Sequence, residues 1–269
     1  MQQRNDKVRP KKFLGQHFLH DQGAAKKIVD GLVVDGARRH PVLEIGPGMG
    51  VLTQYLVQRK DVDLTVVEID RDSVSYLKKH FPSLEGKIIG DDFLDLDLAT
   101  IFPSRFSIIG NFPYNISSQI FFKVMECRHQ VDQVVCMLQK EVADRIAEKE
   151  GSKTYGILSV LLQAYYDIDY LFKVPPGAFH PPPKVMSAVI RLRRNSREEL
   201  GCDEKFFIQV VKQAFNTRRK TLRNALKNLN LAGEVSALPL MDKRAEQLSV
   251  EDFISLTRLI EDSRAGTTS

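Results

Sequence analysis

Short apolar runs alternate with amphipathic segments over the first two thirds of the chain. The runs are rich in Val, Ile and Leu, and most of them end in Gly, Asp or Asn. Buried strands of a parallel sheet have this appearance, and the segments between them have the apolar spacing of helices. We therefore expect seven strands, at residues 42–45, 64–70, 87–90, 106–109, 133–138, 168–174 and 185–193. Strands that alternate with helices predict an α/β fold with a mostly parallel sheet.

The C-terminal part of the chain has helical spacing and follows a polar, linker-like stretch at residues 193–199. Residues 211–233 contain no Asp or Glu. Cations recur there at intervals of seven, four and four residues, on one face of a predicted helix: Lys212, Arg219, Arg223 and Lys227. Cations without acidic partners favour phosphate contacts over a solvated surface. The expected organisation is a basic arm at 1–12, an α/β domain at 13–195 and a small all-α, nucleic-acid-binding domain at 196–269.

Composition narrows the class of protein without identifying it. With 269 residues, of which 43% are hydrophobic, the chain can bury one large core and one small core. No apolar run reaches membrane-spanning length and no signal-peptide core is present, so we expect a cytoplasmic protein without a membrane partner. The three cysteines, Cys127, Cys136 and Cys202, form no C-x-x-C pattern, so neither a disulfide framework nor a metal site is expected. The cations of the N-terminal arm fit a phosphate-binding segment and a solubilising tail equally well.

A glycine-rich turn follows the first predicted strand, at residues 46–50. Its G-x-G-x-G pattern lets a ligand approach the backbone closely where a strand meets a helix. Val51 breaks the G-x-G-x-x-G fingerprint of nicotinamide cofactors, and the turn lacks the lysine of a P-loop. The second strand ends in acidic residues about twenty positions later, at the spacing where a carboxylate meets ribose hydroxyls. Asp92 and Phe93 follow the third strand and would lie beside an adenine.

Asn111, Phe112 and Tyr114 come at the end of the fourth predicted strand, at the sheet edge where open α/β sheets bind ligands. The Asn111 side-chain oxygen and the Phe112 carbonyl can accept both hydrogen bonds of an exocyclic amine, and Tyr114 offers a stacking face. The alternative is an ordinary strand end, with Asn111 bonded to its own backbone. Phe179 lies in a stiff proline-rich loop that is either a plain connector or a second aromatic face closing over Asn111.

Together these motifs resemble those of the ribosomal RNA adenine N6-dimethyltransferase family, in particular its bacterial small-subunit members. The likeness runs from residue 13 to residue 253, and its most specific parts are residues 15–19, 44–50, 111–114, 179–185 and 215–224. The resemblance implies a Rossmann-like class I methyltransferase fold and S-adenosyl-L-methionine as cofactor. His17 departs from the Asn that is usual in the family. The implied cofactor contacts are Gln16, His17, Leu19, Gly46 and Gly48 for the methionine part, Glu68 for the ribose, Asp92 for the adenine amine, and in addition Asn111.

The resemblance also implies a reaction, the N6,N6-dimethylation of two adjacent adenosines in the loop of the 3′-terminal helix of 16S rRNA. The partner would be an immature 30S subunit, with no obligate protein partner. Asn111, Phe112, Tyr114 and Phe179 would form the catalytic pocket. RNA contacts are expected from Lys140, Arg145, Arg218, Arg219, Lys220 and Arg223. Two rivals stay open: a 23S rRNA adenine methylase of the macrolide-resistance type, and a ribosome-assembly factor that has lost catalysis.

Overall fold

Two compact units make up the computed structural model of the chain, which describes residues 8, 10–11, 14–34, 36 and 38–266. The first unit comprises Met1–Ala143 and Ile168–Arg194, and the second comprises Asp144–Asp167 and Asn195–Ser269. The predicted arm at residues 1–12 lies outside the described residues, except for residues 8, 10 and 11. The predicted boundary at residue 195 did not anticipate that Asp144–Asp167 packs with the C-terminal helices.

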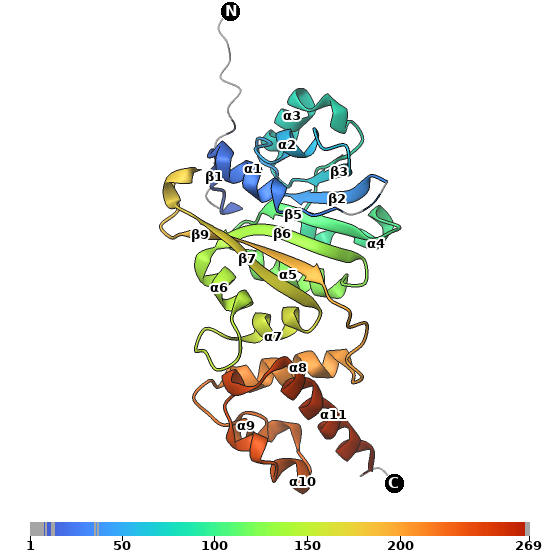
Figure 1. Ribbon diagram of the computed structural model, residues 1–269, viewed down its shortest axis with the longest axis vertical. Coiled ribbons are helices and arrows are strands. Elements are labelled where there is room, and N and C mark those ends of the chain that lie inside the picture. Colours follow the sequence, from blue (N-terminus) through green and yellow to red (C-terminus); the bar gives the residue numbers. More distant parts are fainter. Residues whose placement is uncertain (1–7, 9, 12–13, 35, 37, 267–269) are drawn as a thin grey trace, which may run out of the picture. The chain divides into compact units, whose positions relative to one another are not determined.

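A seven-stranded sheet forms the centre of the first unit, in the order β4-β3-β2-β5-β6-β9-β7 (Figure 1). β2 pairs in parallel with β3 and β5, as β3 does with β4 and β5 with β6, whereas β9 is antiparallel to β6. The predicted α/β fold with a seven-stranded, mostly parallel sheet is confirmed. The strands are β2 (His40–Ile45), β3 (Val62–Val67), β4 (Ile88–Ile89), β5 (Phe106–Asn111), β6 (Val131–Gln139), β7 (Tyr166–Val174) and β9 (Ser187–Arg194).

Helices connect the parallel strands of this unit. Asp21 and Asp70 cap two of them, because their carboxylates accept hydrogen bonds from the backbone N–H groups of Ala24 and Asp72. A separate two-stranded antiparallel sheet joins β1 (Phe18–Leu19) to β8 (Phe179–His180). The helices are α1 (Gln22–Asp30), α2 (Thr53–Leu56), α3 (Arg71–His80), α4 (Leu98–Ile101) and α5 (Ser117–Glu126), with single 3-10 turns at η2 (Pro82–Leu84), η3 (Phe93–Asp95) and η4 (Pro176–Ala178).

β2, β3 and β5 end at the same edge of the sheet. In the strand register, Ile45 lies beside both Val67 and Gly110. A Cβ atom on Gly110 would lie 2.5 Å from the carbonyl oxygen of Ile45, so β5 needs glycine there to approach β2. The segments that follow these strand ends are therefore neighbours, although they are far apart in the sequence.

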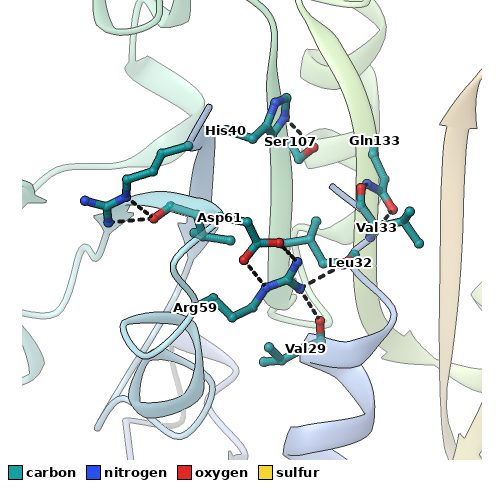
Figure 2. Close-up of polar contacts among 10 residues, drawn as sticks. Val29, Leu32, Val33, His40, Arg59, Asp61, Ser107 and Gln133 are labelled. Atoms are coloured by element: carbon teal, nitrogen blue, oxygen red, sulfur yellow. Dashed lines mark hydrogen bonds and ion pairs between the residues drawn. The ribbon is translucent and has the colours of Figure 1, made fainter. Parts of the chain in front are cut away.

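At the opposite edge of the sheet, long side chains hold the segment that follows α1 (Figure 2). Arg59 donates to the carbonyls of Val29, at 3.1 Å, and Leu32, at 2.8 Å. The Gln133 side chain of β6 accepts from the N–H of Val33 at 3.2 Å and donates to its carbonyl at 2.7 Å. These bonds satisfy backbone groups in the last turn of α1 and in the segment after it, and they fix the connection from α1 to β2.

The second unit is helical, as predicted for the C-terminal part of the chain. Within it α8 packs against α7 and α11, and the rings of Phe215 and Phe253 are 5.8 Å apart in its core. The helices are α7 (Ile157–Gln163), α8 (Glu204–Asn216), α9 (Leu222–Ala225), α10 (Gly233–Ser236) and α11 (Val250–Gly266), with 3-10 turns at η5 (Lys227–Leu229), η6 (Pro239–Asp242) and η7 (Ala245–Gln247). One further helix, α6 (Lys140–Ala147), begins in the first unit and ends in the second.

The predicted basic stripe along one helix is wrong. α8 ends at Asn216 and α9 begins only at Leu222, so the helix is interrupted in the middle of the predicted stripe. The backbone leaves the helical region at Thr217, with φ −128° and ψ 68°. Thr217 and Thr221 flank the break, and β-branched residues weaken a helix because their side chains lose rotamer freedom in it. Lys212 therefore lies on α8 and Arg219 on the loop that follows it. Arg223 and Lys227 lie on the short helical turns α9 and η5.

Candidate active site

A cleft of about 900 Å³, part of it open to solvent, lies at the edge where β2, β3 and β5 end. Its lining comes from residues 14–18, 45–46, 48, 67–69, 91–93 and 111–116, all in the first unit. A smaller adjoining hollow is lined by Leu19, Glu44, Met49 and others. All predicted cofactor residues line the cleft except Leu19, which lines the adjoining hollow. A cleft at the carboxyl ends of parallel strands is where open α/β sheets bind small-molecule ligands.

The glycine-rich turn takes a backbone conformation that favours glycine. Gly46 and Gly48 have φ angles of +65° and +55°. A Cβ atom on Gly48 would lie 3.1 Å from Cε1 of Phe18. The Gly48 N–H donates to Oε2 of Glu68 at 3.0 Å, which links the turn after β2 to the end of β3. The turn therefore brings bare backbone to the cleft, as the sequence predicts.

Two buried carboxylates, those of Glu68 and Glu44, lie close to the glycine-rich turn. Glu68 also accepts from the N–H of Asp70 at 2.9 Å, and burial raises the pKa of Glu68. Since a carboxylate has about four acceptor sites, Glu68 keeps acceptor capacity for ligand hydroxyls. Burial raises the pKa of Glu44 to about 8, although a hydrogen bond donated by Thr53 Oγ1 at 2.7 Å acts in the opposite direction and lowers it. Sequence reasoning missed Glu44, although an acid inside an apolar strand was a signal for it.

Asp92, Phe93 and Ile69 form the side of the cleft next to β3 and β4. Oδ1 of Asp92 accepts from the N–H of Leu94 at 2.9 Å. Phe93 is almost fully buried, whereas Ile69 is 50% exposed and turns an apolar surface to the cleft. Ile69 was not predicted, and its position directly after Glu68 was the only sequence signal for it.

The Asn111 amide has a defined orientation. Its Nδ2 donates to the carbonyl of His17 at 3.1 Å. Because a carbonyl oxygen can only accept, the NH₂ group must face His17, and Oδ1 is left for another donor. The Phe112 N–H donates to the Met137 carbonyl at 2.9 Å, and among the described residues nothing donates to the Phe112 carbonyl. The two predicted acceptors therefore both have capacity to accept.

Tyr114 is held at both its hydroxyl and its ring. The hydroxyl lies 2.5 Å from Oγ of Ser187, and burial raises the pKa of Tyr114. The His17 ring stacks on the Tyr114 ring, with centroids 5.4 Å apart and an interplanar angle of 30°. Nδ1 of His17 lies 2.8 Å from the Pro181 carbonyl, so this nitrogen carries a proton. The contact with Ser187 left no signal in the sequence.

The prediction for Phe179 needs correction. Its side chain is 2% exposed, belongs to the hydrophobic core with Leu19, and does not line the cleft. The cause is the pairing of β8 with β1, which places Phe179 opposite Leu19. The aromatic neighbour of Tyr114 in this structure is His17, the residue at which the sequence departs from the family pattern.

The segment that precedes β1 is fastened beside the cleft. Oε1 of Gln16 accepts from the N–H of Lys11 at 2.8 Å. The Lys11 ammonium pairs with Asp70 and, at 2.7 Å, with Asp72. Gln16 therefore lines the cleft while its side-chain oxygen is already bonded to backbone. Lys11 was predicted only as part of a basic arm.

The six predicted RNA-binding cations fall into three groups. Lys140 and Arg145 are half-buried at the two ends of α6. Arg218 donates to the carbonyls of Lys153 and Tyr155, and Arg223 donates to the carboxylate of Asp242 at 2.7 Å. Arg219 and Lys220 are exposed and form no ion pair within the described residues. Of the six, Arg219 and Lys220 are the two whose side chains make no hydrogen bond or ion pair within the described residues.

In the described part of the chain no group of His, Cys, Asp and Glu could hold a metal ion. Cys127, Cys136 and Cys202 are free thiols, and burial raises the pKa of each. No helix among the described residues is long and apolar enough to cross a membrane.

Comparisons with known proteins show the family of the chain. The family model "Ribosomal RNA adenine dimethylase" matches residues 7–262. A protein of Cytophaga hutchinsonii named "Ribosomal RNA small subunit methyltransferase A" is 60% identical over 95% of this chain and 98% of its own length. A Parabacteroides distasonis protein of the same name is 60% identical over 93% of both chains. A dimethyladenosine transferase structure from Plasmodium falciparum shares the fold, with a TM-score of 0.78 and 24% identity over 92% of this chain and 98% of that one. The chain belongs to the ribosomal RNA adenine dimethylase family.

Proposed function

We propose that the chain transfers methyl groups from S-adenosyl-L-methionine to N6 of two adjacent adenosines in the 3′-terminal helix of 16S rRNA, in an immature 30S subunit. Family membership and the small-subunit name of the relatives support this substrate. The observation that carries the proposal is the orientation of Asn111, whose Oδ1 is left as an acceptor beside the free carbonyl of Phe112. The large-subunit rival shares this chemistry and differs only in the RNA.

The residues around the cleft fit the cofactor. Bare backbone at Gly46 and Gly48 gives the methionine part close access, and Glu68 can accept from ribose hydroxyls. Ile69 and Phe93 offer apolar surface to a purine, and Asp92 has a second carboxylate oxygen for its amino group. When bound, the cofactor supplies a methyl group on a positively charged sulfonium. Gln16 would contribute through its backbone or its amide nitrogen, since Oε1 is engaged by Lys11.

Asn111 and Phe112 would orient the amine that is methylated. The lone pair of adenine N6 is delocalised into the ring, which makes N6 a poor nucleophile. Two acceptors that take both N6 hydrogens favour a pyramidal nitrogen with its lone pair directed at the methyl group. The methylated ammonium is acidic enough to lose its proton to water, so no strong general base is required. Orientation of this kind is worth up to about 7 to 11 kcal/mol.

Tyr114 would supply the stacking surface for the target base. An adenine must leave its helix to reach such a cleft. Stacking on an aromatic side chain is worth about 1 to 3 kcal/mol per base, which offsets the cost of unstacking. The ring already held against Tyr114 is that of His17, so we assign Tyr114 and His17, rather than Phe179, to the aromatic wall of the base site.

Exposed cations in the second unit would hold the RNA backbone. Arg219 and Lys220 lie on the loop before α9, and Lys243 and Arg244 lie between η6 and η7. The Leu222 N–H donates to the Lys243 carbonyl at 2.9 Å, which brings the two segments together. None of the four side chains forms an ion pair within the described residues, so their charge is available to phosphates.

A methylation assay with isolated subunits tests this function. Small and large ribosomal subunits that lack the modification are incubated separately with enzyme and labelled cofactor, and the dimethyladenosines are located by mass spectrometry. We expect two adjacent N6,N6-dimethyladenosines in the 3′-terminal helix of 16S rRNA and none in 23S rRNA. Methylation of 23S rRNA alone would replace the proposal by the large-subunit activity. No transfer to either, with cofactor bound, would replace it by a non-catalytic assembly factor.

A further inference from the structure

The loop at residues 91–97, here called the adenine-side loop, has little regular structure of its own. It follows the two-residue strand β4 and contains only the single turn η3. Asp91, Asp92 and Phe93 of this loop line the cleft. Because a single helical turn leaves most of its carbonyl groups without helical partners, the loop needs contacts from elsewhere to keep one shape.

Lys123, in the last turn of α5, supplies these contacts. Its ammonium donates to the carbonyls of Leu94 and Leu96, at 2.6 Å each. The same ammonium lies 5.7 Å from the centroid of the Phe93 ring, within the range of a cation–π interaction. Among the described residues Lys123 forms no ion pair with a carboxylate. Its charge is thus directed at the adenine-side loop.

Leu94 connects Lys123 to Asp92. Its carbonyl accepts from Lys123, while its N–H donates to Oδ1 of Asp92 at 2.9 Å. Among the described residues Oδ2 of Asp92 has no partner, so this oxygen can accept from a ligand. Lys123 does not line the cleft, and it therefore acts on a ligand only through the loop.

We propose that Lys123 is a positioning residue for the adenine end of the cofactor site, where it holds the adenine-side loop so that Asp92 recognises the 6-amino group of the purine. This role rests on the cofactor proposed above. α5 begins directly after the loop that follows Asn111 and carries Tyr114. One helix therefore follows the loop for the target base and holds the loop for the cofactor.

Binding measurements on the full chain test this role without any methyl transfer. The probes are S-adenosylhomocysteine and S-inosylhomocysteine, which differ at position 6 of the purine, amino in one and oxo in the other, and at N1, which carries a hydrogen only in the oxo form. The variants are Lys123→Met, which keeps the length of the side chain, and Lys123→Arg, which keeps its donors. Lys78→Met is the control, since Lys78 also lies in the last turn of a helix but is exposed and makes no side-chain bond within the described residues.

We expect calorimetry to show that the wild type and the Lys78→Met and Lys123→Arg variants bind S-adenosylhomocysteine at least about tenfold more tightly than S-inosylhomocysteine. One hydrogen bond to a charged group provides an affinity ratio of this size. Lys123→Met should reduce this preference to below about threefold, because a loosened Asp92 no longer distinguishes the two purines. Without ligand, amide hydrogen exchange in the adenine-side loop should be faster in Lys123→Met and unchanged at residues 46–50.

Two results would overturn the role of Lys123: an undiminished preference in Lys123→Met, or unchanged exchange in its adenine-side loop. A wild type that binds neither probe would instead overturn the proposed cofactor, and the role of Lys123 with it. A Lys123→Met protein that binds both probes with equally reduced affinity, at an unchanged ratio, would make Lys123 a purely structural residue.

Discussion

Replacing Asn111 by Ala tests the assignment on which the proposed function depends. The change removes Oδ1, the acceptor left for the target amine, and it also removes the hydrogen bond from Nδ2 to the His17 carbonyl. These two losses have different consequences. The first affects methyl transfer, whereas the second affects the stability of the fold.

The magnitudes follow from the contacts. Loss of one preorganised hydrogen-bonding group at a reacting centre lowers kcat by about 10² to 10³, or roughly 2.7 to 4 kcal/mol. The His17 carbonyl is part-buried and loses its donor, which costs about 1 kcal/mol of folding free energy. The glycine turn and the contacts of Glu68 are untouched, so affinity for S-adenosylhomocysteine should change by less than about threefold.

Asn115→Ala is the matched control. Asn115 lines the same cleft, but its side chain makes no hydrogen bond within the described residues. This variant loses the same atoms without losing an oriented acceptor, and its activity should stay within about threefold of the wild type.

Three measurements separate the possibilities: single-turnover transfer of labelled methyl groups to unmodified small subunits, calorimetric binding of S-adenosylhomocysteine, and urea unfolding. The reasoning is refuted if Asn111→Ala loses cofactor affinity and transfer to the same degree, or if Asn115→Ala is equally inactive.

Three further predictions concern pH, packing and salt. Burial raises the pKa of Glu44 from 4.5 to about 8. The folded protein therefore keeps the Glu44 proton to higher pH than the unfolded chain does. As a result, the free energy of unfolding falls as pH rises from 4.5 to about 8. At about 1.36 kcal/mol per pH unit, the loss of unfolding free energy is at most about 5 kcal/mol. Thermal unfolding of the Glu44→Gln variant, measured across the same pH range, should not show this loss. Gly110→Ala should cost about 1 to 3 kcal/mol in urea unfolding because its Cβ meets backbone, whereas Gly177→Ala, with open space around it, should stay within about 0.5 kcal/mol. Arg219→Ala should lower the log-log salt slope of RNA binding by about 1 and leave stability unchanged. Arg223→Ala should cost up to about 1 kcal/mol of stability, as expected for an exposed ion pair, and should leave the slope unchanged.

The sheet and one side of the active site were predictable because their signals are local. Apolar runs mark strands, and parallel strands end at a common edge, so the residues after β2, β3 and β5 had to meet. Gly46, Glu68 and Asn111 all line the cleft at this edge, although the choice of Glu68 among the acids at the end of β3 came from the family resemblance.

Contacts between distant segments could not be predicted in this way. The bond from Asn111 to His17 spans 94 residues, and the bond from Tyr114 to Ser187 spans 73. No periodicity or motif records such pairs. The same is true of the pairing of β1 with β8, which buries Phe179. The aromatic ring beside Tyr114 is therefore that of His17 and not that of Phe179.

The basic stripe failed for a different reason. Charge spacing predicts a shared face only if the helix continues, and the interruption at Thr217 was not visible in the charge pattern. The absence of Asp and Glu from residues 211–233 was likewise a poor guide to free charge, because Arg223 finds its partner outside that window, at Asp242. Exposure and pairing in the fold, rather than spacing, identify Arg219 and Lys220.

The segment before and within β1 is tied to both halves of the proposed reaction. Gln16 and His17 line the cleft where the cofactor would bind, and the His17 carbonyl orients the amide of Asn111. A change that displaces this segment must therefore alter cofactor affinity and methyl transfer together. A change confined to the Asn111 side chain removes the acceptor and the donor to the His17 carbonyl, but leaves the glycine turn and the contacts of Glu68 in place. The two kinds of variant thus separate binding from orientation, and under the proposed mechanism a loss of transfer at saturating cofactor belongs to orientation.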